Sequence, residues 1–330
     1  MANHEDLLVV ENLTMDFRGA KRFLEKKPSV RAVNNVSFSV KEGETFGLVG
    51  ESGCGKTTLG KCIVRLLKPT EGKLLFNDDG EWKDLLDLKK QESFELRKKV
   101  QIVFQDPYAS LNPQHTILEA FDEPMRVHGI GGDKESRKKL IAEALVRVNL
   151  QPEYMYRYPH EFSGGQRQRI CVAKALVLQP KLIICDEPVS ALDVSVQAQL
   201  LNLMKKLQKE LGITYIFIAH DLSVVQYMSN RIGVMYLGNM VELADSKELY
   251  QNPLHPYTVA LLSAVPVPVV NGKQDRIILE GDVPSPMNPP SGCPFHPRCS
   301  KCMEICKQEK PVLRELQDGH FIACHLYDGK

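Results

Sequence analysis

The sequence lacks an excess of charge of either sign, because its 42 Lys and Arg residues nearly balance its 41 Asp and Glu residues. A near-neutral chain offers neither the basic surface that attracts nucleic acid nor a polybasic membrane anchor. It also has no uninterrupted apolar run of the roughly 20 residues that a membrane-spanning helix needs. We therefore expect no nucleic-acid partner, and a role in transport would need a channel made by other subunits.

Processing signals and repeats are missing as well. The first residues, from Met1 to Asp6, are acidic and lack the apolar stretch of a signal peptide. No internal repeat or low-complexity tract interrupts the chain, and its length predicts two or three packed units. Local motifs must therefore carry the functional information.

A glycine-rich segment from Gly50 to Thr57 fits the pattern G-x-x-x-x-G-K-[ST] of a nucleoside-triphosphate loop. Its glycines let backbone N–H groups surround the β-phosphate, and Lys56 would neutralise the β and γ oxygens. The hydroxyl of Thr57 would bind Mg²⁺, and Thr58 would begin a helix whose N-terminus favours an anion. A glycine turn beside a surface lysine is the alternative. The predicted nucleotide-binding residues are Gly50, Ser52, Gly53, Cys54, Gly55, Lys56, Thr57 and Thr58.

Four apolar runs predict the core of the fold. The runs 46–49, 100–104, 182–185 and 213–219 stop at Gly50, Gln105, Asp186 and His220. Near-continuous apolar runs are typical of parallel strands that are buried on both faces, and such sheets bind ligands beyond the carboxyl ends of their strands. The sequence therefore predicts an α/β fold with a parallel core sheet and one nucleotide across its edge.

Two adjacent carboxylates follow the third of these runs. Asp186 would orient Mg²⁺, directly or through water, and Glu187 is placed to polarise the attacking water as a general base. A surface turn is the alternative, but a buried strand end rarely tolerates two carboxylates without a cation.

A second glycine-rich element, Ser163 to Gln166, begins a predicted helix with Ser163 as its N-cap. The apolar face of this helix holds Ile170, Ala173, Leu176 and Val177. Gly164 and Gly165 each cost the first turn roughly 1 kcal/mol relative to alanine. A phosphate that touches the backbone would explain them, and a helix cap without a function remains the alternative.

Together, the loop, the element Ser163–Gly164–Gly165–Gln166 and the pair Asp186–Glu187 resemble the ATP-binding-cassette (ABC) ATPases. The resemblance implies a P-loop ABC ATPase domain in which an antiparallel β subdomain, built from segments 8–17 and 32–40, accompanies the core sheet. A hairpin over 231–242 would close this domain, segment 18–30 would be a surface loop, and a helical subdomain would span about 106–179.

The resemblance also implies roles for single residues. Gln105 would contact Mg²⁺ and water, and His220 would reach the γ-phosphate as a switch histidine. Phe17 would stack on adenine, with an ordinary core phenylalanine as the alternative. Ser163–Gln166 would serve a nucleotide held by another subunit, and the segment 190–193 would cross the dimer interface.

Downstream segments narrow the resemblance to one subfamily. Segments 252–258, 293–299 and 103–113 resemble the ATPases of oligopeptide and dipeptide importers, over about residues 5 to 327. This implies a second ABC ATPase subunit, a paralogue, with two transmembrane permease subunits and an extracytoplasmic peptide-binding protein. The chain would lie on the cytoplasmic face of the cell membrane as a peripheral subunit. Nickel or another small solute, or a soluble ABC ATPase without a transport role, are the alternatives.

Cysteine is concentrated near the C-terminus. Reduced thiols in a cytosolic nucleotide enzyme indicate metal binding rather than disulfides. The importer resemblance implies that the ligands are Cys293, Cys299, Cys306 and Cys324, and that Cys302 is not one of them. Four thiolates suit Zn²⁺ or an iron–sulfur cluster, and the importer resemblance implies a [4Fe-4S] cluster; free thiols without metal are a third possibility. We predict a nucleotide-binding domain at 1–250 and an extension at 251–330. The cysteine cluster lies far in sequence from the ATP residues, so we expect its loss to leave the affinity for ATP nearly unchanged.

Overall fold

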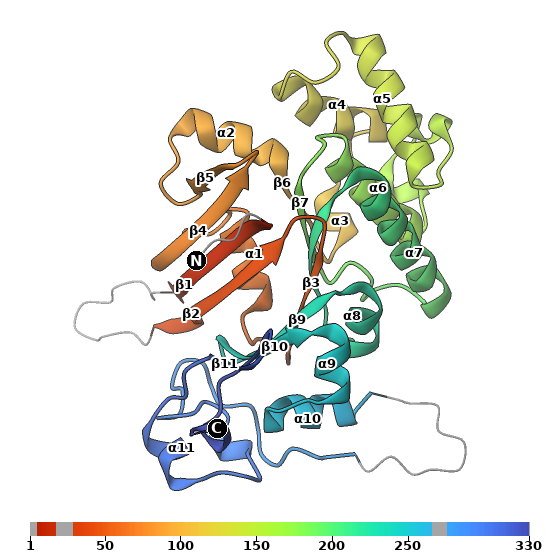
Figure 1. Cartoon of the computed structure of the whole chain (residues 1–330). Coiled ribbons are helices and arrows are strands. Elements are labelled where there is room, and N and C mark those ends of the chain that lie inside the picture. The colour runs from red at the N-terminus through yellow and green to blue at the C-terminus, as the bar shows by residue number, and fades with distance from the viewer. Residues whose placement is uncertain (1–4, 18–28, 266–275, 330) are drawn as a thin grey trace, which may run out of the picture. The chain divides into compact units, whose positions relative to one another are not determined.

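The computed structural model describes residues 5–17, 29–265 and 276–329, which Figure 1 draws as a coloured ribbon. These residues divide into two compact units. The first unit holds the described residues of 1–40, 45–86 and 219–330, and the second holds 41–44 and 87–218. Most of segment 18–30, which the sequence predicts as a surface loop, lies outside the described residues.

The first unit contains a sheet with the strand order β2-β1-β4-β5. Its strands are β1 (Asp6–Phe17), β2 (Val30–Lys41), β4 (Glu71–Asp78) and β5 (Glu81–Asp84). Strand β4 pairs antiparallel with β1 and β5, and the register places Leu8 opposite Phe76. Both side chains are fully buried, so this pair contributes to the core under the sheet. The predicted antiparallel β subdomain is confirmed.

A second run of strands in the same unit has the order β11-β12-β10-β9-β3. These are β3 (Thr45–Val49), β9 (Arg231–Tyr236), β10 (Asn239–Asp245), β11 (Arg314–Gln317) and β12 (His320–Ile322). Strands β3 and β9 are parallel, whereas β9, β10, β12 and β11 pair antiparallel. Leu237 and Gly238 both have positive φ, of 43° and 77°, which suits the tight turn of a hairpin. The predicted hairpin is therefore confirmed, with β10 ending at Asp245.

Residues near the C-terminus are built into this unit. Strand β12 pairs with β10, and Glu242 of β10 accepts hydrogen bonds from the N–H groups of Leu254 and His255. Figure 1 shows this C-terminal segment, in blue, beside β10 and α10. The helices of the unit are α1 (Lys56–Ile63), α8 (Leu222–Met228), α9 (Ser246–Gln251), α10 (Pro256–Ser263), α11 (Glu304–Gln308) and the 3-10 turns η3 (His296–Arg298) and η4 (His325–Tyr327).

The second unit contains the parallel strands β6 (Val100–Val103), β7 (Leu182–Asp186) and β8 (Thr214–Ile218), in the order β8-β7-β6. Every residue of β7 and β8 is buried, which explains their continuous apolar sequence. The register pairs Asp186 with Ile218, so these two strands end at the same edge. The prediction of parallel core strands is confirmed.

Helices dominate the remainder of the second unit. They are α2 (Lys90–Lys99), α3 (Pro107–Ser110), α4 (Ile117–Val127), α5 (Lys134–Arg147), α6 (Gly164–Leu176), α7 (Val194–Leu211) and the 3-10 turns η1 (Pro152–Tyr156) and η2 (Pro159–Glu161). Asp133 caps α5 by accepting the N–H of Ser136 at 2.9 Å, and Ile141 and Leu145 on the predicted face are buried. Helices and 3-10 turns thus occupy much of segment 106–179.

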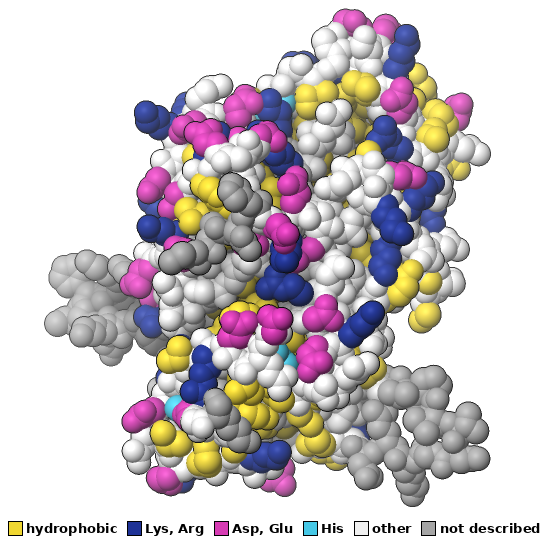
Figure 2. All heavy atoms as spheres, in the orientation of Figure 1, with side chains coloured by type: hydrophobic (Ala, Val, Ile, Leu, Met, Phe, Trp, Pro, Cys, Tyr) yellow, Lys and Arg dark blue, Asp and Glu magenta, His cyan; other side chains and the backbone are white. Residues whose placement is uncertain are grey.

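The surface carries charge of both signs. In Figure 2, Lys and Arg side chains intermingle with Asp and Glu side chains over the visible face, as the overall charge balance predicts. Within the described parts of the chain, no helix has the length and apolar character required to cross a bilayer.

Candidate functional site

The predicted phosphate loop connects β3 to α1, and its backbone requires glycine at two positions. Gly50 has φ of 149°, and a Cβ there would lie 2.2 Å from the carbonyl oxygen of Met235. Gly55 has φ of 105°, and its Cβ would lie 2.1 Å from the carbonyl oxygen of Ala32. Both distances are too short for any side chain, so the loop is held tightly against β9 and β2.

Lys56 lies within the curve of this loop. Its Nζ donates hydrogen bonds to the carbonyl oxygens of Gly50, at 2.7 Å, and Glu51, at 3.0 Å, and the residue is 5% exposed. Burial raises the pKa of the neighbouring Cys54 thiol, which keeps that group neutral. The loop therefore holds its one ammonium group where the motif requires it.

The helix after the loop starts earlier than the sequence predicts. Helix α1 begins at Lys56 rather than at Thr58, so Thr57 and Thr58 both lie in its first turn. Its N-cap, Gly55, is left-handed and has no side chain that could occupy the first N–H groups. An uncapped helix N-terminus next to a cation suits the binding of a phosphate.

Glu51 is held by two C-terminal residues that sequence reasoning missed. Its N–H donates to the Oη of Tyr257 at 2.9 Å. Arg298 forms a fork with its carboxylate, with Nη1 to Oε2 at 2.8 Å and Nη2 to Oε1 at 3.2 Å. Tyr257 and Arg298 lie 206 and 247 positions away from Glu51 along the chain, so no local sequence pattern predicts these contacts.

In the second unit, the structure brings Gln105 and Glu187 together. The Nε2 of Gln105 donates to Oε2 of Glu187 at 2.8 Å, across 82 positions of sequence. Glu187 follows β7 with φ of 47°, a conformation that is uncommon for a residue with a side chain. The preceding Asp186 is buried at the end of the strand. The carboxylates and the glutamine amide thus gather at the carboxyl ends of β6 and β7.

The second glycine-rich element is a capping box. Ser163 Oγ accepts the N–H of Gln166 at 3.3 Å, and Gln166 Oε1 accepts the N–H of Ser163 at 3.0 Å. A Cβ on Gly165 would lie 2.4 Å from Cγ1 of Val196 on α7, whereas one on Gly164 would meet nothing closer than 3.7 Å. Packing against Val196 therefore explains why position 165 is a glycine. Gly164 is exposed, and packing inside this unit does not require a glycine there.

The remaining predicted residues lie at element ends. Phe17 ends β1 and is 40% exposed, so it is not the core phenylalanine that the sequence left open. His220 follows β8 and is exposed. Asp193 caps α7 by accepting a hydrogen bond from the N–H of Val196 at 2.9 Å. Helix capping thus accounts for the carboxylate in the segment 190–193.

The four predicted tail cysteines line one small cavity, together with His255 and Phe295, and Cys302 is not among its lining residues. Burial raises the pKa of Cys293 to about 12 and that of Cys324 to about 11, and the neighbouring thiols add to the shift. All nine cysteines are free of disulfides. Four thiols are a suitable donor set, but the described residues include no three His, Cys, Asp or Glu side chains arranged as metal ligands.

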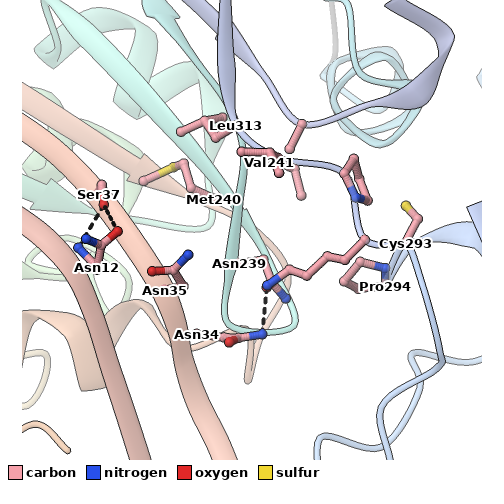
Figure 3. Close-up of a pocket in the computed structure, with 14 residues that line it drawn as sticks. Asn12, Asn34, Asn35, Ser37, Asn239, Met240, Val241, Cys293, Pro294 and Leu313 are labelled. Atoms are coloured by element: carbon pink, nitrogen blue, oxygen red, sulfur yellow. Dashed lines mark hydrogen bonds between the residues drawn. The ribbon is translucent and has the colours of Figure 1, made fainter. Parts of the chain in front are cut away.

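A second pocket of the first unit, of about 220 Å³, is lined by both polar and apolar side chains (Figure 3). Asn12, Asn34, Asn239 and Cys293 are among its lining residues, and Nδ2 of Asn34 donates to Oδ1 of Asn239 at 2.9 Å. None of the predicted nucleotide or magnesium residues lines this pocket, so we do not assign it to the nucleotide.

Comparisons with known proteins agree with these features. Residues 33–190 match the family model described as "ABC transporter", and residues 241–306 match "Oligopeptide/dipeptide transporter, C-terminal region". The oligopeptide transport ATP-binding protein AppF of Bacillus subtilis strain 168 is 53% identical over 329 residues, or 99% of each chain. The protein OppF of Haemophilus influenzae, which has the same description, is 48% identical over 98% of this chain and 97% of its own length.

A solved structure shares the fold. The dimeric post-hydrolysis state of the ATP-binding cassette MJ0796, bound to ADP and Pi, is 30% identical and matches with a TM-score of 0.62. The match covers 73% of this chain and 99% of that one. The loop, the capping box and the two family models lead to one conclusion: the chain belongs to the ABC transporter ATP-binding proteins, in the oligopeptide/dipeptide transporter group.

Proposed function

We propose that the chain is the ATP-hydrolysing subunit that powers the import of oligopeptides or dipeptides through a membrane ABC transporter. The observation that carries the proposal is the glycine loop closed around Lys56, in a chain whose full-length relatives are named as oligopeptide transport ATP-binding proteins. The names of these relatives favour a peptide over nickel or another small solute as cargo.

ATP would bind at the loop from Gly50 to Gly55. The N–H groups of Ser52, Gly53 and the first turn of α1 would surround the phosphates, and Lys56 would exchange its loop carbonyls for phosphate oxygens. Phe17, exposed at the end of β1, would stack on the adenine. The loop is already in its turned conformation, so binding would require little reordering of the backbone.

Thr57, Gln105 and Asp186 are the proposed ligands of Mg²⁺, because hydroxyl, amide and carboxylate oxygens form the donor set that this ion prefers. The ion would neutralise charge on the β and γ phosphates. Glu187 would take a proton from the attacking water, whose oxygen bonds to the γ-phosphorus while the bond to ADP breaks. The hydrogen bond from Gln105 holds the Glu187 carboxylate, and His220 would contact the γ-phosphate.

A second ABC ATPase subunit, a paralogue, would complete the cycle. The exposed Ser163 and Gly164 would contact a nucleotide held by that subunit, so the γ-phosphate favours a closed dimer and its loss reopens it. Moving a closed state from 1:99 to 99:1 needs about 5.5 kcal/mol of differential affinity. We further propose that the chain is peripheral at the cytoplasmic face of the membrane, below two transmembrane permease subunits fed by an extracytoplasmic peptide-binding protein.

The extension at 251–330 would carry a [4Fe-4S] cluster on Cys293, Cys299, Cys306 and Cys324, with Zn²⁺ as the alternative. The support is that these four thiols line one cavity and Cys302 does not. Such a group would supply structural order to a segment with little apolar material of its own, rather than electrons for hydrolysis.

Reconstitution tests the transport role. The chain, its permease subunits and the binding protein, placed in liposomes with ATP inside, should take up a labelled peptide, and Lys56→Ala should abolish uptake. Uptake of nickel without uptake of peptide would overturn the cargo, and an ATPase that binds no permease would overturn the transport role.

A further inference from the structure

The contact between the phosphate loop and the C-terminal region involves a partly buried ion pair. Arg298 is 8% exposed and the side chain of Glu51 is 27% exposed, and the fork geometry gives two charge-assisted hydrogen bonds. Glu51 raises the pKa of the Arg298 guanidinium further above its ordinary value. Such a pair has a defined orientation, unlike an exposed ion pair between flexible side chains.

Both C-terminal partners of Glu51 are anchored on a buried aromatic cluster. Tyr236 lies 4.7 Å from Tyr257 and 5.2 Å from Phe295 between ring centroids, and Tyr257 lies 5.4 Å from Phe295. All three side chains are almost fully buried. Arg298 follows in the turn η3 and donates its N–H to the carbonyl of Phe295 at 3.0 Å. The phenol and the guanidinium are therefore presented from a rigid base.

Glu51 in turn orients the lysine of the loop. Its carbonyl and that of Gly50 accept the hydrogen bonds of Lys56 Nζ. The peptide that precedes Glu51 is held by Tyr257 on its N–H side, and the side chain is held by Arg298. A glycine-rich loop has much conformational freedom to lose when it binds a ligand, and fixing it beforehand lowers that cost.

We propose that Arg298 and Tyr257 are positioning residues for ATP: they hold Glu51, and through it the phosphate loop and Lys56, in the conformation that binds nucleotide. This inference rests on the proposed assignment of Gly50–Thr58 to ATP. It gives the C-terminal extension a part in nucleotide binding, although neither residue belongs to the loop.

The experiment uses Arg298→Ala, Tyr257→Phe and a matched control, Arg314→Ala. Arg314 also belongs to the extension and pairs with Asp328, with Nη2 to Oδ1 at 2.5 Å, away from the loop. Binding of a fluorescent ATP analogue with Mg²⁺ and steady-state ATPase rates would be measured for each full-length protein. We expect Arg298→Ala to raise Kd and KM by roughly 5- to 20-fold, within the range of coupling between linked sites, with kcat retained. Tyr257→Phe should raise both less, and Arg314→Ala should change neither.

A second set of variants separates positioning from simple stabilisation. If Arg298 acts through Glu51, the double variant Glu51→Gln with Arg298→Ala should bind ATP no more weakly than Arg298→Ala alone. Arg298→Lys should restore binding only in part, because an ammonium group cannot form the fork. Tyr257→Phe keeps the aromatic ring and so tests the loop in a protein that folds.

The outcomes are distinct. Unchanged Kd and KM in Arg298→Ala and Tyr257→Phe, even with a lower melting temperature, would overturn the positioning role. Independent effects of Glu51→Gln and Arg298→Ala would also overturn it. A wild-type protein that binds no ATP would instead refute the nucleotide assignment on which the inference rests.

Discussion

The two glycine-rich elements of this chain contain the same residue for different physical reasons. In the phosphate loop, Gly50 and Gly55 have backbone angles and carbonyl neighbours that exclude any side chain. In the element at the start of α6, Gly165 is excluded from substitution by Val196, while Gly164 is exposed with space around it. The first element is thus completed by contacts inside its own unit, and the second presents a surface that its own unit does not use.

The largest effect on ATP turnover should come from Glu187, a residue outside both glycine-rich elements. Its substitution separates the binding of ATP from its hydrolysis. Glu187→Gln removes the proposed base and should cut turnover by roughly 10²- to 10⁴-fold while ATP binding persists. Lys56→Ala should weaken ATP binding itself. Turnover and analogue binding, measured on both variants, check this. Wild-type turnover in Glu187→Gln would remove that carboxylate from the mechanism.

The addition of one methyl group to the phosphate loop should be enough to abolish its binding of ATP. Gly55→Ala forces a side chain against the Ala32 carbonyl at a φ of 105°, so we expect ATP binding to be lost. Gly80→Ala is the matched control, because Gly80 has φ of 96° and a Cβ there would meet nothing within 4 Å. Titration with an ATP analogue compares the two. Equal binding by both variants would show that close packing of the loop is unimportant.

The second element can be blocked without touching the first. Ser163→Arg places bulk where we propose that the partner's nucleotide docks, so ATP-dependent dimerisation should fail while the variant's own loop binds ATP normally. Sedimentation of the variant mixed with its partner subunit, with and without ATP, together with ATP binding measured on the variant alone, decides this. If Ser163→Arg abolished ATP binding by its own monomer, the two-subunit geometry would be wrong.

Alanine substitutions at the neighbouring Gly164 and Gly165 should change the free energy of unfolding in opposite directions. Gly165→Ala overpacks against Val196 and should destabilise the fold by about 1–3 kcal/mol. Gly164→Ala should stabilise the helix by up to about 1 kcal/mol, yet weaken ATP-dependent dimerisation. Denaturant unfolding measures the first effect and sedimentation the second. Identical unfolding curves for the two variants would refute the packing difference.

The smallest effect on the ATP cycle should come from the cysteine region. Anaerobically purified protein should be brown, and Cys306→Ser should bleach it, whereas Cys302→Ser should not, because Cys302 does not line the cavity. The KM for ATP should stay nearly unchanged in Cys306→Ser, in contrast to Arg298→Ala, because the pair of Arg298 with Glu51 remains. Colourless protein with one equivalent of zinc would show that the bound metal is zinc rather than iron. Metal-free protein with an ordered tail would exclude both metals.

Sequence alone determined the local elements. The pattern around Lys56, the continuous apolar strands and the cap at Ser163 are recognisable because each depends on residues close together in the chain. The family resemblance selected four of the five tail cysteines, and the structure places those four around one cavity. The start of α1 at Lys56, two residues before the predicted start, reflects a left-handed Gly55 that a motif does not specify.

Tertiary structure decided which of these residues support one another. The contact of Gly165 with Val196, the hydrogen bond of Gln105 with Glu187 and the hold of Arg298 on Glu51 join residues from separate elements. The sequence placed the cysteine tail far from the ATP residues, yet the fold brings Tyr257 and Arg298 to the phosphate loop. Contacts between distant segments leave no periodic trace in a single sequence, because they depend on how strands and helices pack rather than on local spacing.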